Sequence, residues 1–366
     1  MYWDEEDISL VDATIRSGIS WAGGPKIAEF EQGIADYVGS KYCLAFNSGT
    51  SALHAALAAY GIGKGDEVIV PSFTFIATAN APQFVGARPV FADIEEKTCG
   101  LDPDDVLAKI TKKTRAIIPV HYGGCPCNIT ALHNIAEDHN LILIEDAAEA
   151  FGAKVKDRKV GTFGDSGMFS FCQNKIITTG EGGAMVTDSR DLFEKMKLIR
   201  SHGRLETCDY FSTSAVMDYV SIGYNLRMSS ITAALGIAQL KKVEKIIQIR
   251  RRDASRYCKA LMVGVPEISY PKIPDGYNHV YQLFSVFAQD RDNLIKHLDH
   301  GGIMTKIYFS PVHETAFYRK ILKYRCNLPV TEKIARSIIS LPFYPGISSR
   351  DIDAVVESIR DFYGEH

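Results

Sequence analysis

The sequence predicts an α/β protein with a mostly parallel central sheet and a smaller C-terminal α/β domain. Short apolar runs alternate with helix-like segments up to about residue 200, a pattern typical of a sheet covered by helices on both faces. A long amphipathic helix, expected over about 230–261, then leads away from the sheet, and the remaining residues alternate strand and helix again. We therefore place a domain boundary near residue 245, between a large domain (1–245) and a small domain (246–366).

The individual elements follow from hydrophobic periodicity and turn residues. Residues 5–40 are expected to be helical, because Ile27, Phe30 and Ile34 recur at helical spacing. A strand at 42–46 leads through a polar turn into a helix at 52–60, and a strand at 67–71 precedes a helix at 76–85. Further strands are expected at 88–93, 115–121, 141–144, 168–171, 184–187, 279–288 and 305–308, further helices at 192–199, 290–298 and from 349, and an irregular loop at 202–224.

Composition argues against several classes of function. The net charge of −3 comes without a basic stripe, so we expect no nucleic-acid partner. No apolar run is long enough to cross a bilayer and the acidic first residues do not resemble a signal peptide, so we expect a cytoplasmic protein without a membrane partner. The eight cysteines are scattered, and only Cys125 and Cys127 are close together, so we expect no metal site.

Residues 141–187 carry the strongest chemical signal. An apolar run ends in Glu145 and Asp146, which places a carboxylate at the carboxyl end of a buried strand, where open α/β sheets bind ligands. Lys175 follows a second apolar run, and a lysine in such surroundings gives up its proton more easily and can attack a carbonyl. An acid and a lysine of this kind suit pyridoxal phosphate (PLP). The ordinary alternative is a solvated lysine and an acid that caps a turn or a helix.

A third element lies upstream, where the strand at 42–46 ends. The turn Asn47–Ser51 is followed by an Ala/Leu-rich helix, and the free N–H groups and positive dipole end of a helix N-terminus form an anion site. The alternative is an ordinary N-cap, since Ser and Thr are common caps. Phe75 also stands at the carboxyl end of a strand, where its ring suits a cofactor's face, although a single Phe is more typical of core packing.

Taken in this order, Asn47–Thr50, Glu145–Asp146 and Phe169–Phe171 with Lys175 resemble the DegT/DnrJ-type sugar aminotransferases. This is a family of PLP enzymes with the fold-type-I aminotransferase fold, and the resemblance covers nearly the whole chain. The form of residues 174–183 (NKIITTGEGG) looks most like the perosamine-synthase-like branch, which aminates C4 of nucleotide-linked 4-keto-6-deoxy sugars. The resemblance therefore implies the cofactor PLP, a nucleotide-activated keto sugar and an amino-acid donor, expected to be L-glutamate.

The resemblance also implies a role for individual residues. Lys175 is expected to bind the cofactor aldehyde and then transfer the proton, and Asp146 to pair with the pyridine nitrogen. Phe75 is expected to stack on the ring, and Glu149 stands near the ring oxygen, where other members often carry His or Gln. The residues implied in holding the phosphate are Ser48, Gly49, Thr50 and Ser170.

Other implied contacts lie at a subunit boundary or at the substrate. Asn225 is expected to reach the phosphate in the neighbouring subunit, which makes the protein a homodimer with shared active sites. Tyr308, His313 and Arg227 are expected to contact the substrate.

Several alternatives remain open at this point. In other members of the same family the acceptor is a C3-keto sugar, a cyclitol or an aromatic precursor, and each of these is an alternative acceptor here. A PLP dehydratase is a further alternative, but the dehydratase branch carries His in place of the lysine that is present here as Lys175. A non-enzymatic regulator with the same fold is disfavoured, because the positions that hold the cofactor are all filled.

Overall fold

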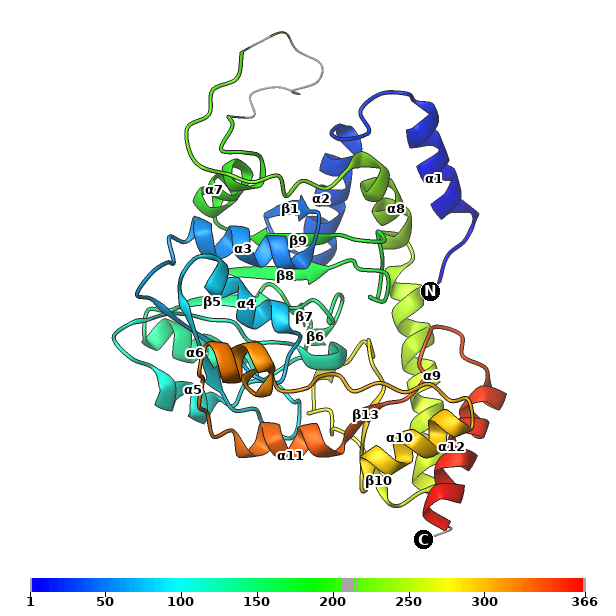
Figure 1. Ribbon diagram of the computed structural model, residues 1–366. Coiled ribbons are helices and arrows are strands. Elements are labelled where there is room, and N and C mark those ends of the chain that lie inside the picture. Colours follow the sequence, from blue (N-terminus) through cyan, green and yellow to red (C-terminus); the bar gives the residue numbers. More distant parts are fainter. Residues whose placement is uncertain (1, 206–213, 215, 365–366) are drawn as a thin grey trace.

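A seven-stranded mixed sheet forms the centre of the protein. The computed structural model describes residues 2–205, 214 and 216–364 (Figure 1). The strand order is β1-β9-β8-β5-β4-β2-β3. The strands are β1 (Tyr42–Phe46), β2 (Glu67–Pro71), β3 (Arg88–Ala92), β4 (Thr114–Ile117), β5 (Ile142–Asp146), β8 (Ser166–Ser170) and β9 (Gly183–Thr187).

Only β9 runs against its neighbours in this sheet. It pairs antiparallel with β1 on one side and β8 on the other, whereas the pairs from β8 to β3 are all parallel. The reason is local: a loop without a helix connects β8 to β9, and a parallel pair would need a longer crossover. The predicted mostly parallel sheet is confirmed, and the carboxyl ends of every strand except β9 meet at one edge.

Helices cover both faces of this sheet. Leu44 and Phe46 of β1 pack into the core on one face, while Cys43 and Ala45 pack into the core on the other, as alternation along a strand requires. The helices on the first face are α3 (Gly49–Ala59), α4 (Ile76–Phe84) and α7 (Arg190–Arg200). Those on the second face are α2 (Pro25–Val38) and α8 (Ser230–Leu240) near β1, and α5 (Pro103–Lys109) and α6 (Ile129–Asp138) near β4, while α1 (Glu5–Arg16) packs on α8.

Side-chain caps determine where many of these helices begin. Ser48, Ser189 and Ser229 each accept a hydrogen bond from a backbone N–H in the first turn of α3, α7 and α8. Asp4 and Asp102 do the same for α1 and α5. These caps satisfy donors that the helices themselves leave unpaired.

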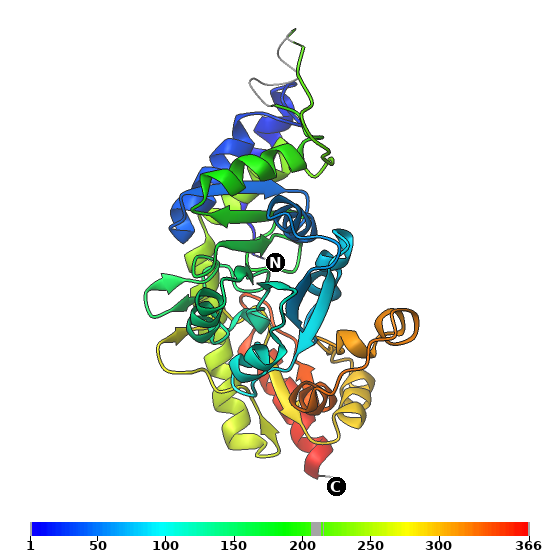
Figure 2. The ribbon, with the colours of Figure 1, turned by 90° about the vertical axis from the view of Figure 1, so that its left-hand side faces the viewer.

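The C-terminal part has a core of its own. Figure 2 shows the last helix (red) at the end of the molecule opposite the first helices (dark blue). A three-stranded antiparallel sheet in the order β10-β12-β13 packs with three helices. Its elements are α9 (Val243–Gly264), β10 (Ile268–Ser269), β12 (Ser285–Ala288), α10 (Arg291–His300), β13 (Ile338–Ser340) and α12 (Ser349–Gly364). The predicted smaller α/β unit is confirmed, and the boundary near residue 245 stays a prediction.

Two further contacts join the C-terminal part to the N-terminal part of the chain. Tyr277–Asn278 (β11) pairs with Lys154–Val155 (β6), which pairs with Arg158–Lys159 (β7). The segment 311–337 also returns to the β2–β3 edge, where Asp93 accepts the N–H groups of Val330 and Thr331. This segment contains a 3-10 turn, η2 (Val312–Glu314), a π-helical turn, η3 (Phe317–Ile321), and the helix α11 (Pro329–Ser337). A further 3-10 turn, η1 (Tyr122–Gly124), follows β4.

Several predicted elements differ from the structure. The helix expected at 5–40 is two helices, α1 and α2, because Gly18, Ser20 and Gly24 between them have positive φ angles that end the helical geometry. The strand expected at 115–121 ends at Ile117 as β4.

The long helix at 230–261 is two helices, and Lys242 at their junction binds Asp4 and Asp7 of the N-terminal segment. The strand at 279–288 is shortened to β12, because residues 280 and 283 bind the turn at 122–124 instead of a neighbouring strand. The strand at 305–308 is reduced to one bridge, between Lys306 and Ser340. Of the expected loop at 202–224, residues 206–213 and 215 lie outside the described residues.

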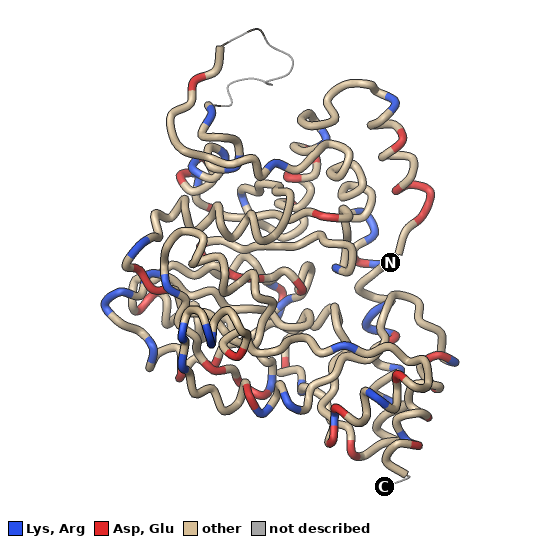
Figure 3. The backbone as a smooth tube through the Cα atoms, in the orientation of Figure 1, with Lys and Arg blue, Asp and Glu red and all other residues tan. Residues whose placement is uncertain are grey.

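Charged residues of both signs are interspersed along the described chain (Figure 3). Within that same part of the chain, no helix is long and apolar enough to span a bilayer, and no three His, Cys, Asp or Glu side chains gather in a way that suits a metal ion.

Glu145 fixes the end of β5 through its buried side chain. The carboxylate accepts N–H bonds from Gly161, Phe163 and Gly164 at 2.6–2.8 Å, and His121 Nε2 lies 3.0 Å away. The other nitrogen of His121 accepts the N–H of Cys127, so His121 is a structural histidine, as a single strand-end His usually is. Glu145 is therefore a structural acid, and its neighbour Asp146 points elsewhere.

We expect Glu145→Ala to lower the free energy of unfolding by at least about 3 kcal/mol, because three buried N–H donors lose their acceptor at about 1–3 kcal/mol each. Chemical denaturation of the cofactor-free protein measures the change. The control is Glu137→Ala, whose side chain is mostly exposed and should change stability by less than about 0.5 kcal/mol. Equal effects of the two substitutions would contradict the structural role of Glu145.

Candidate active site

The candidate site lies where the carboxyl ends of β1, β8 and β5 meet. Phe46 and Ser170 both pair with Gly183, so the ends of β1 and β8 flank the first residue of β9. Asp146 pairs with Met168 in the neighbouring strand β8. The sheet register thus brings the turn after β1, the end of β8 and the acid of β5 to one edge, although they are far apart in the sequence.

The N-terminus of α3 forms a tight cradle with the end of β8. A Cβ atom on Gly49 would lie 2.7 Å from the sulfur of Met168 and 3.4 Å from Cβ of Ser170. A Cβ atom on Gly183 would lie 2.3 Å from the backbone nitrogen of Gly49. Glycine is therefore required at Gly183, where the close atoms are backbone, whereas a Cβ atom at Gly49 would force the Met168 side chain to move. The first N–H groups of α3 face this edge without an intrahelical partner.

Ser48 and Thr50 flank Gly49 in this cradle. The hydroxyl of Ser48 caps α3 by accepting the N–H of Ser51 at 3.1 Å, as the ordinary N-cap alternative predicts. Thr50 is half-buried in the first turn of the helix. The cap and an anion site are compatible, since the cap satisfies one donor and leaves others.

Asp146 is a buried carboxylate at the end of β5. Its Oδ2 accepts the Thr78 hydroxyl at 2.7 Å, and its Oδ1 accepts the N–H of Ala148 at 3.2 Å. Burial raises the pKa of the Asp146 carboxyl above its ordinary value, although these hydrogen bonds and the charge of Lys175 act in the opposite direction. A further cation beside Asp146 would favour its ionised form.

Lys175 lies on the loop between β8 and β9, with its side chain largely buried. Its Nζ is 3.4 Å from Oε1 of Glu149, whose own side chain is 7% exposed. The second oxygen of Glu149 accepts the N–H of Gly123 at 2.9 Å. The only lysine predicted to be reactive is thus held by a buried carboxylate that is itself anchored to the backbone.

Phe75 is the N-cap residue of α4, and its side chain is 59% exposed. The nearest aromatic neighbour recorded for it is Phe309, with ring centroids 6.0 Å apart. Core packing, the more typical role of a single Phe, is therefore wrong for Phe75. An exposed ring at the ligand-binding edge is available for a planar ligand.

Asn225 and Arg227 lie along the extension of β1. Arg227 forms a bridge with Phe46, and Asn47 donates to the carbonyl of Asn225 at 3.5 Å. Arg227 also donates to the hydroxyl of Ser201 at 3.1 Å. Both residues are therefore beside the turn that forms the cradle.

The two remaining predicted residues have structural partners. The carbonyl of Tyr308 accepts the hydroxyl of Tyr122, and the ring of Tyr308 lies 5.1 Å from Nζ of Lys306. His313 is buried with Nδ1 2.7 Å from the hydroxyl of Ser72, and burial lowers the pKa of its imidazole. The hydrogen bonds of His313 to Ser72 thus hold it at the end of β2.

Sequence reasoning missed the residues that support the predicted ones. Thr78 holds Asp146, Gly123 holds Glu149, and Gln282 donates to the carbonyl of Asn174 beside Lys175. A Thr in the first turn of α4 at the ligand-binding edge was a usable signal. Gly123 and Gln282 gave none, because their partners are 26 and 108 residues away.

These residues fit PLP. The glycine cradle at the N-terminus of α3 suits a phosphate. Burial raises the pKa of the Asp146 carboxyl, and a pyridinium nitrogen beside it would stabilise the ionised carboxylate. Lys175 supplies an amine for the aldehyde. The fold and the site together define a PLP-dependent enzyme.

Comparison with known proteins agrees with this class. The DegT/DnrJ/EryC1/StrS aminotransferase family model matches residues 2–360, and the chain belongs to that family. GDP-perosamine synthase of Caulobacter vibrioides is 40% identical over 341 residues, which cover 92% of this chain and 90% of that protein. The protein is accordingly a PLP-dependent aminotransferase.

Solved structures are similar over the whole chain. A DegT/DnrJ/EryC1/StrS aminotransferase from Brucella abortus is 33% identical with a TM-score of 0.90, covering 98% of this chain and 96% of that one. A protein from Streptococcus pneumoniae in its PLP form is 26% identical with a TM-score of 0.92, covering 100% of this chain and 97% of that one. The predicted aminotransferase fold is confirmed.

We expect Asp146→Asn to stabilise the cofactor-free protein, and more so at pH 8 than at pH 4, close to the ordinary pKa of the carboxyl. Because the pKa of Asp146 is raised in the folded state, stability falls as the pH rises from the ordinary value of 3.8 through the folded value, and it stays lower above that. An Asn amide avoids this loss: it accepts from Ala148 and donates to Thr78, whose hydroxyl proton can turn to Thr74 at 2.9 Å.

Thermal unfolding of the cofactor-free wild type and variant at both pH values measures this effect. Asp191→Asn, which changes an exposed carboxylate, is the control and should show no such pH-dependent gain. A lower midpoint for Asp146→Asn than for the wild type at pH 8 would show that burial does not dominate the energetics of this carboxyl.

Proposed function

We propose that this aminotransferase transfers an amino group from L-glutamate to C4 of a nucleotide-linked 4-keto-6-deoxy sugar. The observation that carries the proposal is the assembly at one sheet edge of a buried acid, an amine and a glycine cradle, namely Asp146, Lys175 and Gly49. The sugar acceptor is supported by the GDP-perosamine synthase among the relatives. The choice of C4 is supported by the form of residues 174–183.

The proposed roles follow from position and chemistry. PLP supplies an electron sink that makes a proton on the substrate carbon removable. Lys175 would hold the cofactor through its aldehyde, and once the amine of the substrate has replaced it there, the freed Nζ would take that proton and return it as a general base placed by the loop. Asp146 would pair with the ring nitrogen and favour its protonated form. Glu149 would hold the amine in place between transfers, since it lies 3.4 Å from Nζ.

The remaining residues bind and orient. Gly49, Thr50 and Ser170, with the cap Ser48, would hold the phosphate, and the exposed ring of Phe75 would cover one face of the cofactor. Fixing the phosphate and the ring aligns the bond that breaks with the π-system.

The substrate and the second subunit complete the proposal. Arg227, Tyr308 and His313 are proposed to contact the substrate, and Arg227 is the natural partner for its phosphates. Asn225 is proposed to reach the phosphate held by a second copy of the chain, in a homodimer with shared active sites. The cytoplasmic location stays a prediction.

A reverse half-reaction screen tests the acceptor. The PLP-loaded enzyme is mixed with nucleotide-linked 4-amino and 3-amino sugars, and the visible absorbance of the lysine-bound cofactor is followed. Loss of absorbance with one 4-amino sugar nucleotide supports the proposal and identifies the nucleotide. Reaction with L-glutamate but with no sugar nucleotide would overturn the sugar acceptor and favour a cyclitol or an aromatic precursor.

We expect Lys175→Ala to abolish turnover, because the variant lacks the amine that binds the aldehyde and moves the proton. The visible absorbance of lysine-bound PLP should be absent as well. Lys333→Ala changes an exposed lysine on α11 and should keep both properties. Turnover at the wild-type rate in Lys175→Ala would refute the proposed mechanism.

A further inference from the structure

Gln282 comes from the C-terminal part of the chain and is buried beside the loop that carries Lys175. Its side chain is 3% exposed, and its amide nitrogen donates to the carbonyl of Asn174, the residue before Lys175. Its amide oxygen is buried, and among the described residues it has no hydrogen-bond partner. Burying this amide with its oxygen unpaired costs stability, so packing alone does not explain a glutamine at this position.

A second path joins the same segment to the amine itself. The N–H of Leu283 donates to the carbonyl of Gly123 at 3.1 Å, and the N–H of Gly123 donates to Glu149 at 2.9 Å. Glu149 in turn lies 3.4 Å from Nζ of Lys175. Residues 279–283, called here the 279–283 segment, thus contact the backbone of the Lys175 loop directly and are joined to the amine through Gly123 and Glu149.

The packing at Gly124 leaves this arrangement little freedom. Gly124 has a φ of +95°, and its carbonyl accepts the N–H of Val280 at 3.0 Å. A Cβ atom at this position would lie 2.8 Å from the side chain of Val280, 2.9 Å from the nitrogen of Gln282 and 3.1 Å from the carbonyl oxygen of Glu149. A shift of the 279–283 segment would therefore displace Glu149, which holds the amine of Lys175.

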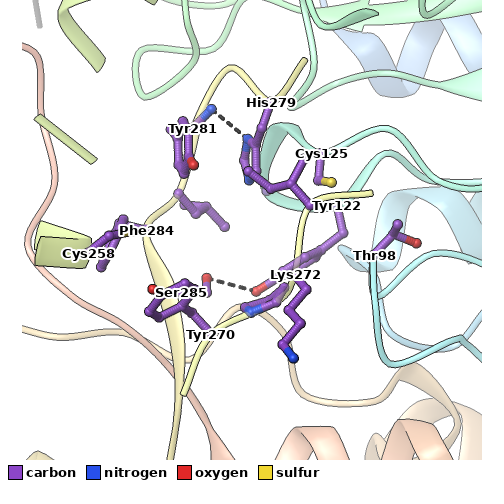
Figure 4. Close-up of a pocket in the computed structure, with 14 residues that line it drawn as sticks. Thr98, Tyr122, Cys125, Cys258, Tyr270, Lys272, His279, Tyr281, Phe284 and Ser285 are labelled. Atoms are coloured by element: carbon purple, nitrogen blue, oxygen red, sulfur yellow. Dashed lines mark hydrogen bonds between the residues drawn. The ribbon is translucent and has the colours of Figure 1, made fainter. Parts of the chain in front are cut away.

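Hydrogen bonds from α9 add to the packing that holds the 279–283 segment. Arg250 of α9 donates to the carbonyls of Tyr281 and Gln282 at 2.9 and 3.3 Å, and Arg251 donates to the carbonyl of His279 at 2.9 Å. Beside them lies a cavity of about 380 Å³, into which His279 and Tyr281 face (Figure 4). Because open space borders the segment on that side, polar contacts such as that of Gln282 act together with the packing of Val280 in fixing its position.

We propose that Gln282 is a positioning residue for Lys175, through which the C-terminal part of the chain sets the position of the amine. This inference rests on the proposed role of Lys175. Proton transfer and attack on a carbonyl depend steeply on placement, and a shift of about 1 Å can cost about 100-fold in rate. Loss of the Gln282 contact should therefore slow the chemistry and leave ground-state binding of the amino donor nearly unchanged.

The test compares Gln282→Leu and the shorter Gln282→Asn with a matched control, Gln239→Leu. Gln239 is equally buried, and its replacement removes hydrogen bonds to Tyr2 and Asp7 at a site on α8 away from the Lys175 loop.

PLP-loaded proteins are mixed with L-glutamate, and the loss of visible absorbance is followed as a function of L-glutamate concentration. We expect the limiting rate to fall about 10- to 100-fold in both Gln282 variants, with an apparent Kd within about twofold of the wild type. Gln282→His, which keeps an N–H donor at a similar reach, should recover most of the rate.

Hydrogen–deuterium exchange of residues 171–182 gives a readout that needs no substrate. We expect faster exchange there in Gln282→Leu and Gln282→Asn than in the wild type, and wild-type exchange in Gln239→Leu. Unchanged exchange in the Gln282 variants, or equal rate losses in the Gln282 and Gln239 variants, would overturn the positioning role. If wild-type protein does not react with L-glutamate, the proposed donor is wrong, and exchange alone decides the role of Gln282.

Discussion

A buried carboxylate at the end of a central strand is the constraint on which the site depends. Asp146 is held by Thr78 and by a backbone N–H, yet burial still raises the pKa of its carboxyl. A chain optimised only for stability would place an apolar side chain here, since an acid with a raised pKa costs stability at neutral pH. The cost becomes useful when a ligand brings a cation to Asp146, as PLP does with its ring nitrogen.

The antiparallel strand β9 arranges the other groups around that acid. Because β9 lies between β1 and β8, both of these strands run in the direction of β5 and end at its edge. This single reversal places the N-terminus of α3 beside the end of β8, and it places the β8–β9 loop, with Lys175, over the same edge. The 279–283 segment then fixes that loop from the C-terminal part of the chain. Cofactor binding and the placement of the amine are thus properties of the whole fold.

The sequence alone predicted what depends on local pattern. The strand that ends in Asp146, the turn at Ser48–Gly49 and the loop position of Lys175 follow from apolar runs and glycines, and so does the α/β class. Long-range partners decided the rest. The break between α8 and α9 accompanies the ion pairs of Lys242 with Asp4 and Asp7, and the exposure of Phe75 reflects the open edge beside it. Gln282 has no local sequence signature, because its amide donates to the carbonyl of Asn174, which is distant in the sequence.

The position of the covalent link to PLP tests the central claim most directly. PLP-loaded wild-type protein is treated with borohydride, which makes the link permanent, and is then digested and mapped by mass spectrometry. Modification of the peptide that contains Lys175, and of no other lysine in stoichiometric amount, is the predicted result. Stoichiometric modification of a different lysine, or of none, would contradict the assignment of Lys175 and with it the site built around Asp146.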